Sequence, residues 1–188
     1  MAGYLAALTI ALLLGMVLTR VYLLRKAGTN AMHFGKIDKT DFLLPPFVLF
    51  YFYTIFAAAF GWPLVSAQRF IESDVVAWIG VALCVAGLLV VLISLISFGT
   101  SFRVGIDVDN PDELVTTGMF AISRNPIYVG IVLVLIGQFL VFPNWIPLAY
   151  LAAASWLIHR QVLREEEFMR KHYGQQYVEY CKRVRRYV

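Results

Sequence analysis

Residues Ser123–Pro147 read SRNPIYVGIVLVLIGQFLVFPNWIP, and this stretch decides the fold. Its middle is an apolar run, Tyr128–Phe142, which follows a proline that suits the first turn of a helix because that turn needs no N–H there. In FPNWIP, two prolines and an asparagine break the helix and turn the chain. A second apolar run, Trp145–Ile158, comes next. The pattern predicts a helical hairpin whose two arms are short for full membrane spans.

The composition of the rest of the chain predicts an integral membrane protein. Of 188 residues, 60% are hydrophobic, and the mean hydropathy is +0.72. Soluble domains are about 45–50% apolar. Three tracts carry no charge, namely Gly3–Thr19, Phe42–Gln68 and Val75–Gly99. They predict helices over about Tyr4–Leu24, Phe42–Ala67 and Val75–Phe98. With the hairpin, we expect an all-α membrane protein with about five transmembrane helices and a polar, helical C-terminal segment, His159–Val188.

The basic residues predict the orientation in the membrane. Eight of the sixteen Lys and Arg residues lie in the C-terminal segment, and five lie in or beside the first loop (Arg20, Arg25, Lys26, Lys36, Lys39). Arg103 and Arg124 flank the third connection. The positive-inside rule therefore places these segments in the cytoplasm and the N-terminus outside, which five crossings satisfy. We expect a plasma membrane of prokaryotic type. The basic C-terminal segment can also act only as a topology signal that touches anionic lipid.

The sequence disfavours several other classes of protein. No Asp or Glu falls within an apolar tract, whereas ion-coupled transporters and proton pumps usually need such a carboxylate. Cys84 and Cys181 form no disulfide or metal pattern, and the histidines are scattered. Neither a Rossmann fingerprint nor a P-loop is visible. The basic residues lie at membrane ends, so no nucleic-acid partner is expected, and the oligomeric state stays open.

Three polar motifs could carry chemistry at the cytoplasmic face. The first is SRNPIYVG (Ser123–Gly130), which taken alone is a helix start that Ser123 or Asn125 can cap. The second is REEEF with YGQQYVEY, which can equally be a solvated helix start where acids favour the macrodipole. The third is DELVTTGMF, a turn or short strand in which Gly118 permits a positive φ.

In their order and spacing these motifs resemble the isoprenylcysteine carboxyl methyltransferase family and its relatives among the phospholipid methyltransferases. The family pattern is LVxxGxYxxxRHPxYxG, an apolar hairpin, then EExxL, FGxxYxxY and VPRFIP. This chain has LVTTGMFAISRNPIYVG, the hairpin, then EEEF, YGQQYVEY and VRRYV. The likeness covers about 99–188. The first three helices, within 1–98, match only in hydrophobicity, and the two parts are expected to form one structural domain.

The resemblance implies a membrane methyltransferase that uses S-adenosylmethionine and has no Rossmann domain. Glu165 and Glu166 match the paired glutamates, Glu167 is an extra acid, and Arg186 matches the arginine of the terminal motif. The cofactor-binding residues it implies are Leu114, Val115, Gly118, Arg124, Asn125, Pro126, Tyr128, Glu165 and Glu166. It implies no metal, and the sequence identifies no catalytic base.

Two departures from the family pattern bear on the site. Asn125 replaces the family histidine, and an asparagine keeps a hydrogen bond but carries no proton near neutral pH. Arg185 replaces the proline of the terminal motif, so we expect the C-terminal tail to close the site less firmly.

Three functions stay open from the sequence. A methyltransferase is favoured, with a prenylated cysteine carboxylate, a phospholipid amine, a small thiol or another hydrophobic molecule as the acceptor. The alternative enzyme is an NADPH-dependent reductase of sterol or steroid type, whose acid pair is RDE-like and not consecutive. A non-enzymatic membrane protein that keeps the fold is the third.

Overall fold

A computed structural model describes residues 1–26, 44–62, 69–99 and 114–188, and its regular elements are helices. In chain order these are α1 (Ala2–Lys26), α2 (Leu44–Ala59), α4 (Asp74–Phe98), the 3-10 turn η3 (Gly118–Ala121), α5 (Pro126–Val141), α6 (Trp145–Tyr173) and α7 (Gln175–Arg183). The first loop, most of the third connection with Arg103, and Asp112 lie outside the described residues.

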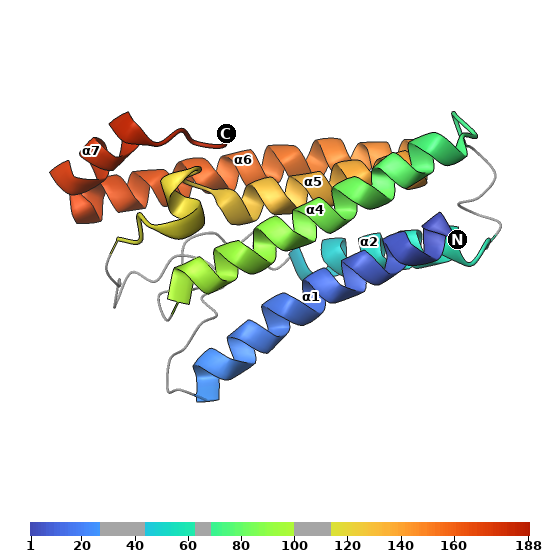
Figure 1. The fold of residues 1–188 in the computed structure, drawn as a ribbon, viewed down its shortest axis with the longest axis horizontal. Helices are drawn as coiled ribbons and strands as arrows, with labels where there is room; N and C mark the ends of the chain where they lie inside the picture. The colour runs from blue at the N-terminus through green and yellow to red at the C-terminus, as the bar shows by residue number, and fades with distance from the viewer. Residues whose placement is uncertain (27–43, 63–68, 100–113) are drawn as a thin grey trace.

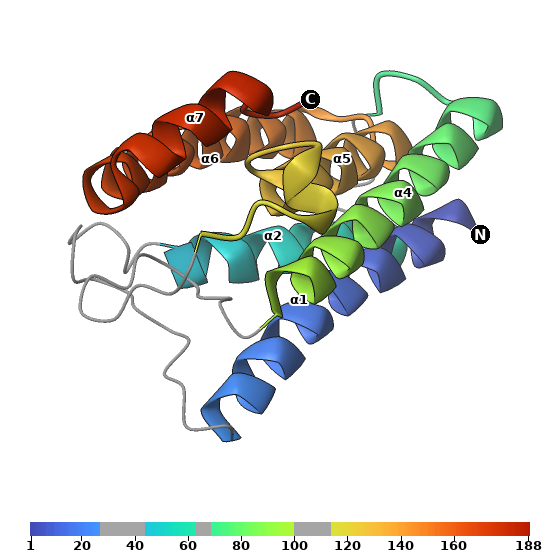
Figure 2. The same cartoon turned by 60° about the vertical axis from the view of Figure 1, so that its left-hand side comes forward.

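The long helices form one elongated bundle (Figure 1). Helix α4 lies along α5, and α5 packs on α6, while α1 contacts α2, α4 and α5. The N-terminus lies at one end of the bundle, and α7 lies with the C-terminus and η3 at the other (Figures 1 and 2). The polar end that holds α7 is therefore well separated from the end where the chain begins.

Helices α4 and α5 pack with their backbones unusually close, because glycines face each other across the interface. Gly80 faces Gly137, and Gly87 faces Gly130, which is the order expected for antiparallel helices. A Cβ placed on Gly80 or Gly87 would lie 2.6 Å from the carbonyl oxygen of the opposite glycine. Small residues are the common means of close helix contact in membranes. This packing fixes where α5 begins relative to α4.

A buried amide ties α1 to α5 in the core. Gln138 is fully buried, and its Nε2 donates to the carbonyl of Ala6 at 2.6 Å and to Thr9 Oγ1 at 3.1 Å. Apolar side chains from five helices surround this contact, including Ile10, Ile55 and Val134. The N-terminal helices and the hairpin thus share one core.

The predicted break after the first arm of the hairpin is confirmed. Helix α5 ends at Val141, and Asn144 caps α6 by accepting a hydrogen bond from the Ile146 N–H at 2.8 Å. The second arm differs from the prediction, because α6 continues for 29 residues into the polar segment. Helix continuity needs no apolar residues, so the hydrophobic run marked only the first half of α6.

The N-terminal helices are close to their predicted limits, with one exception. Helices α1 and α4 extend past the predicted ends by one or two residues. Helix α2 ends at Ala59, well before the predicted Ala67, and Gly61 follows with φ +73°. A residue with this φ has left the right-handed helical region.

Two helices, α1 and α4, are long and apolar enough to cross a membrane by length and composition, and Pro46–Ala59 and Pro126–Val141 are shorter apolar helices. Large apolar side chains are exposed on these helices, such as Leu49 (66%) and Ile96 (68%). Water would penalise such a surface, whereas lipid would not. Membrane character is therefore supported, and the number of crossings remains a prediction.

Candidate active site

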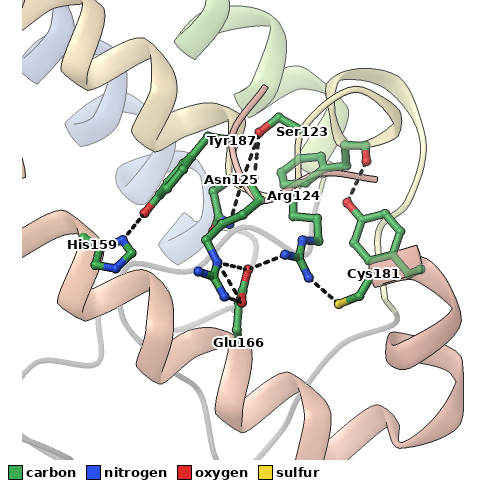
Figure 3. Close-up of polar contacts among 10 residues, drawn as sticks. Ser123, Arg124, Asn125, His159, Glu166, Cys181 and Tyr187 are labelled. Carbon is green, nitrogen blue, oxygen red and sulfur yellow. Dashed lines mark hydrogen bonds and ion pairs between the residues drawn. The ribbon is translucent and has the colours of Figure 1, made fainter. Parts of the chain in front are cut away.

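One carboxylate, Glu166 on α6, lies at the centre of a polar cluster where α5 begins (Figure 3). Arg186 Nε donates to both of its oxygens at 3.1 Å, and Arg186 Nη2 donates to Oε2 at 2.8 Å. Arg124 Nη2 lies 3.3 Å from Oε1. The Glu166 side chain is only 8% exposed. Two guanidinium groups therefore share one buried carboxylate, which leaves one excess positive charge in the cluster.

The three consecutive glutamates point in different directions. Glu165 accepts a hydrogen bond from Tyr128 Oη at 2.7 Å and another from Gln161 Nε2 at 2.9 Å. Glu167 is exposed and pairs with Lys171, one helical turn later, at 2.6 Å. The first two acids thus face the entrance of α5, and the third faces outward. This arrangement agrees with the sequence-based division into a family pair and an extra acid.

Burial raises the pKa of the Glu165 carboxyl above its usual range, although the hydrogen bonds from Gln161 and Tyr128 oppose the shift. Loss of hydration disfavours the charged form of an acid. Because the pKa of Glu165 is higher in the folded state than in the unfolded state, its protonated form stabilises the fold. This stabilisation is complete at pH values below the unfolded-state pKa. That contribution is lost as pH rises through the folded-state pKa. Glu165 therefore gains its charge at a higher pH than an exposed glutamate does.

The C-terminal tail, Val184–Val188, lies against the start of α5 (Figure 3). The Arg124 N–H donates to the carbonyl of Arg185 at 2.9 Å, and Asn125 Nδ2 donates to the carbonyl of Arg186 at 3.1 Å. Ser123 Oγ also donates to the Arg186 carbonyl, at 3.4 Å. Farther along the tail, Tyr187 Oη lies 2.8 Å from His159 Nδ1 on α6.

These contacts bear on the expectation that Arg185 weakens closure of the tail, which stays a prediction. Residue 185 contributes its carbonyl oxygen to Arg124, and a proline there would offer the same acceptor. The replacement therefore removes no bond at this point, while the Arg185 side chain is exposed.

Helix α7 adds residues that the sequence did not identify as part of the site. Tyr177 is 1% exposed, and Tyr180 Oη donates to the carbonyl of Phe120 in η3 at 2.6 Å. Burial raises the pKa of Tyr180 to about 12, so it keeps its proton. Cys181 Sγ accepts a hydrogen bond from Arg124. The spacing of the last two tyrosines in YGQQYVEY places both on one helix face, and this spacing could have indicated their burial.

The other residues implied by the resemblance, Leu114, Val115, Gly118 and Pro126, lie along the chain that leads into α5. Leu114 and Val115 are half-buried in the irregular segment before η3. Gly118 has φ +60°, as predicted, and a Cβ there would collide with Ser97 of α4. Pro126 begins α5, also as predicted, and it is fully buried. The structure thus brings Arg124, Asn125, Tyr128, Glu165 and Glu166 together, while Gly118 packs on α4.

The idea that Ser123 or Asn125 caps α5 with its side chain is wrong. Asn125 occupies the N-cap position, yet its side chain makes no capping bond. It is 7% exposed and turns toward the tail. Ser123 Oγ accepts instead from the Asn125 N–H at 3.1 Å. The Asn125 side-chain amide therefore donates its hydrogen bond to Arg186 and holds that residue in place.

We expect Asn125→Leu to weaken binding of S-adenosylhomocysteine, because the Arg186 carbonyl loses a buried donor and the tail loosens. Asn125→His restores the family residue and a ring N–H donor, so any methyl-transfer activity should stay within about tenfold of wild type. Calorimetric titration, with turnover once an acceptor is known, measures both. Unchanged affinity in Asn125→Leu would show that this bond does not support the ligand site.

The fold and the cluster together define a class: a helical membrane protein with a charged site formed by the entrance of one helix, a long neighbouring helix and the C-terminal tail. Residues 75–176, more than half of the chain, match the model of the phospholipid methyltransferase family. The chain belongs to this family.

Similar proteins carry names from the isoprenylcysteine branch. The protein-S-isoprenylcysteine O-methyltransferase of Xenopus laevis is 31% identical over 144 residues, which cover 70% of this chain and 48% of that protein. Protein-S-isoprenylcysteine O-methyltransferase B of Arabidopsis thaliana is 29% identical over 108 residues, or 56% and 55% of the two chains. The chain thus spans about half the length of these curated relatives.

A solved structure has the same fold. The eukaryotic intramembrane Ras methyltransferase ICMT superposes with a TM-score of 0.62 at 20% identity, covering 88% of this chain and 58% of that one. At this identity the likeness concerns the arrangement of helices. Coverage of 88% means that the likeness extends into the N-terminal helices, which matched the family pattern only in hydrophobicity.

Proposed function

We propose that this chain is an integral membrane methyltransferase that uses S-adenosylmethionine and acts on a lipophilic or small acceptor at the membrane surface. One observation carries the proposal most directly. Of three consecutive glutamates, the two that match the family pair turn inward to the entrance of α5, and the third turns to the surface. Family membership supplies the class of reaction.

The residues present fit the amino-acid part of this cofactor, which carries an ammonium and a carboxylate. Arg124 and Arg186 outnumber Glu166, so the cluster keeps a positive charge for a carboxylate. Arg124 Nε is buried without a hydrogen-bond partner among the described residues. A buried donor of this kind is costly unless a ligand satisfies it. Glu165, one residue away from Glu166, offers a negative charge for an ammonium.

When bound, the cofactor supplies a methyl group activated by a sulfonium. The chain's own residues then need only to bind and orient, because methyl transfer to a thiolate or carboxylate requires no strong base. Arg124 and Arg186 bind the carboxylate, and Glu165 binds the ammonium. The tail closes over the entrance of α5 through Asn125 and so limits access of water. The acceptor would come from the bilayer between helices.

Calorimetric titration of the purified protein with S-adenosylhomocysteine and with NADPH tests the proposal. We expect binding of the first and not of the second. Binding of NADPH alone would favour the reductase, and binding of neither would favour a non-enzymatic protein that keeps the fold. A tritiated-methyl transfer screen against lipid extract, farnesylcysteine analogues and small thiols would then identify the acceptor.

We expect the affinity for S-adenosylhomocysteine to fall as pH is lowered from 7, because Glu165, whose pKa is raised by burial, takes up a proton at a higher pH than an exposed glutamate does. Glu165→Gln should weaken binding by roughly tenfold to a hundredfold at pH 7 and make it nearly independent of pH. A flat profile in the variant then identifies Glu165 as the group responsible. A variant that keeps the wild-type slope would exclude this role.

For the orientation we propose that the N-terminus faces outside and the tail faces the cytoplasm, as the basic residues predict. Single cysteines at positions 2 and 188, in a chain without Cys84 and Cys181, test this with an impermeant thiol reagent on intact cells. Only position 2 should react. Reaction at position 188 from outside would overturn the orientation.

A further inference from the structure

The end of the bundle opposite Glu166 contains a cavity of about 480 Å3. It lies where α1 begins and α5 ends, and its walls include Arg69, Asp74, Trp78 and Phe142. A hollow of about 380 Å3 adjoins it and shares Arg69 and Asp74. The volume is ample for a lipid headgroup, since ligand pockets run from about 300 to 1,000 Å3. Nothing in the proposed methyl transfer uses this cavity.

The cavity holds opposite charges that do not neutralise each other. The Arg69 guanidinium lies 6.0 Å from the centroid of the Phe142 ring, and Asp74 is the first residue of α4. Within the described part of the chain, neither side chain forms an ion pair. Both side chains are exposed, and Glu72 adds a second acid in the adjoining hollow. Walls that carry both signs of charge without pairing of Arg69 and Asp74 are suited to a ligand carrying both charges. Trp78, half-exposed beside Asp74, adds an aromatic face that can attract an ammonium.

The depth of the cavity in the membrane follows from the aromatic residues around it. Exposed aromatic side chains gather in the segments at this end of the bundle: Tyr4, Phe60, Trp62, Phe70, Trp78 and Trp145. Tryptophan and tyrosine concentrate at the level of the lipid headgroups. The cavity therefore opens at headgroup depth, where a phospholipid is the most abundant molecule with separated charges.

We propose that this cavity binds the headgroup of a zwitterionic phospholipid, with Arg69 on the phosphate and Asp74 and the Trp78 ring on the ammonium. Helix α5 runs over 16 residues from the Glu166 cluster, at its start, to the wall of this cavity, at Val141. At 1.5 Å per residue the separation is about 24 Å. The lipid bound here is thus distinct from any acceptor at the reaction site.

Native mass spectrometry of the full chain in maltoside micelles tests the proposal at limiting lipid. Phosphatidylcholine should be retained about tenfold more than phosphatidylglycerol, which lacks the ammonium. Arg69→Gln should lower retention of both lipids about tenfold, since both carry the phosphate. Asp74→Asn should lower retention of phosphatidylcholine only. Arg25→Gln, an exposed arginine at the other end of α1, is the matched control and should change neither.

Several results would overturn the proposal. Equal or stronger retention of phosphatidylglycerol would mean that the ammonium is not recognised. Wild-type retention in Arg69→Gln would mean that lipid binds elsewhere on the helices. Displacement of the lipid by equimolar phosphocholine would show that the cavity takes a free small molecule and not a membrane lipid. S-adenosylhomocysteine binding, measured on the same variants, should be unchanged, so failure here leaves the proposed function unaffected.

Discussion

Gly87→Val should prevent α4 and α5 from packing and cause the largest loss of folded protein of any single change considered. The new Cβ would lie 2.6 Å from the Gly130 carbonyl oxygen and 2.9 Å from the Val134 nitrogen. Both obstacles are backbone atoms, which cannot rotate away as a side chain can. Overpacking typically lowers the free energy of unfolding by about 1 to 3 kcal/mol, and by more where the neighbouring atoms cannot move. We expect at least the upper value, which lowers a thermal midpoint by roughly 6 to 12 °C.

Gly15→Val is the matched control for this experiment. Gly15 also lies in a long apolar helix, but a Cβ there meets nothing within 4 Å. The thermal midpoint of each variant in detergent, followed by fluorescence-detected size exclusion, compares the two. A wild-type thermal midpoint for Gly87→Val would mean that α4 and α5 can move apart with little loss of stability. The close packing would then not hold the hairpin in place.

The α4–α5 interface also shows how far the sequence predicts this fold. The apolar tracts predict the helices, and the turn residues of FPNWIP predict the break between α5 and α6. Both signals are readable because burial and turn chemistry act locally. The glycines of GVALCVAG and GIVLVLIG share a spacing of seven residues. This spacing does not indicate which helix packs against each of them. Pairing of Gly80 with Gly137 is a property of the antiparallel arrangement. It became visible only once both helices were placed.

The sequence predicts those parts of the site in which the motifs of the family pattern face one another. The inward turn of Glu165 and Glu166 and the outward turn of Glu167 follow from helix geometry and the family pattern. The partner of Asn125 does not, because it is a backbone carbonyl 61 residues away. Main-chain acceptors are present at every residue, so no sequence pattern identifies the Arg186 carbonyl as the partner of Asn125. For the same reason the sequence predicts a helix cap at Ser123 and not its bond to that carbonyl.

Glu166→Gln should be the most damaging change at the polar end of the bundle. It leaves Arg124 and Arg186 facing each other without the carboxylate that both contact. Removing one partner of a buried ion pair costs about 3 to 5 kcal/mol, and the lower end applies because Arg186 is 37% exposed and partly screened by water. The tail should detach from the start of α5, since its strongest anchor is lost. Binding of S-adenosylhomocysteine should fall by at least tenfold.

The three neighbouring glutamates make this prediction selective. Glu167→Gln removes an exposed acid that pairs only with Lys171, so it should leave both stability and affinity close to wild type. Glu165→Gln removes a charge whose burial is already unfavourable, so affinity should fall while the unliganded protein keeps its thermal midpoint. Glu166→Gln alone should lower both and should expose Val184–Val188 to hydrogen exchange. Equal effects at all three positions would mean that the run is only a solvated segment of α6, and the ion pairs of Glu166 would then organise no site.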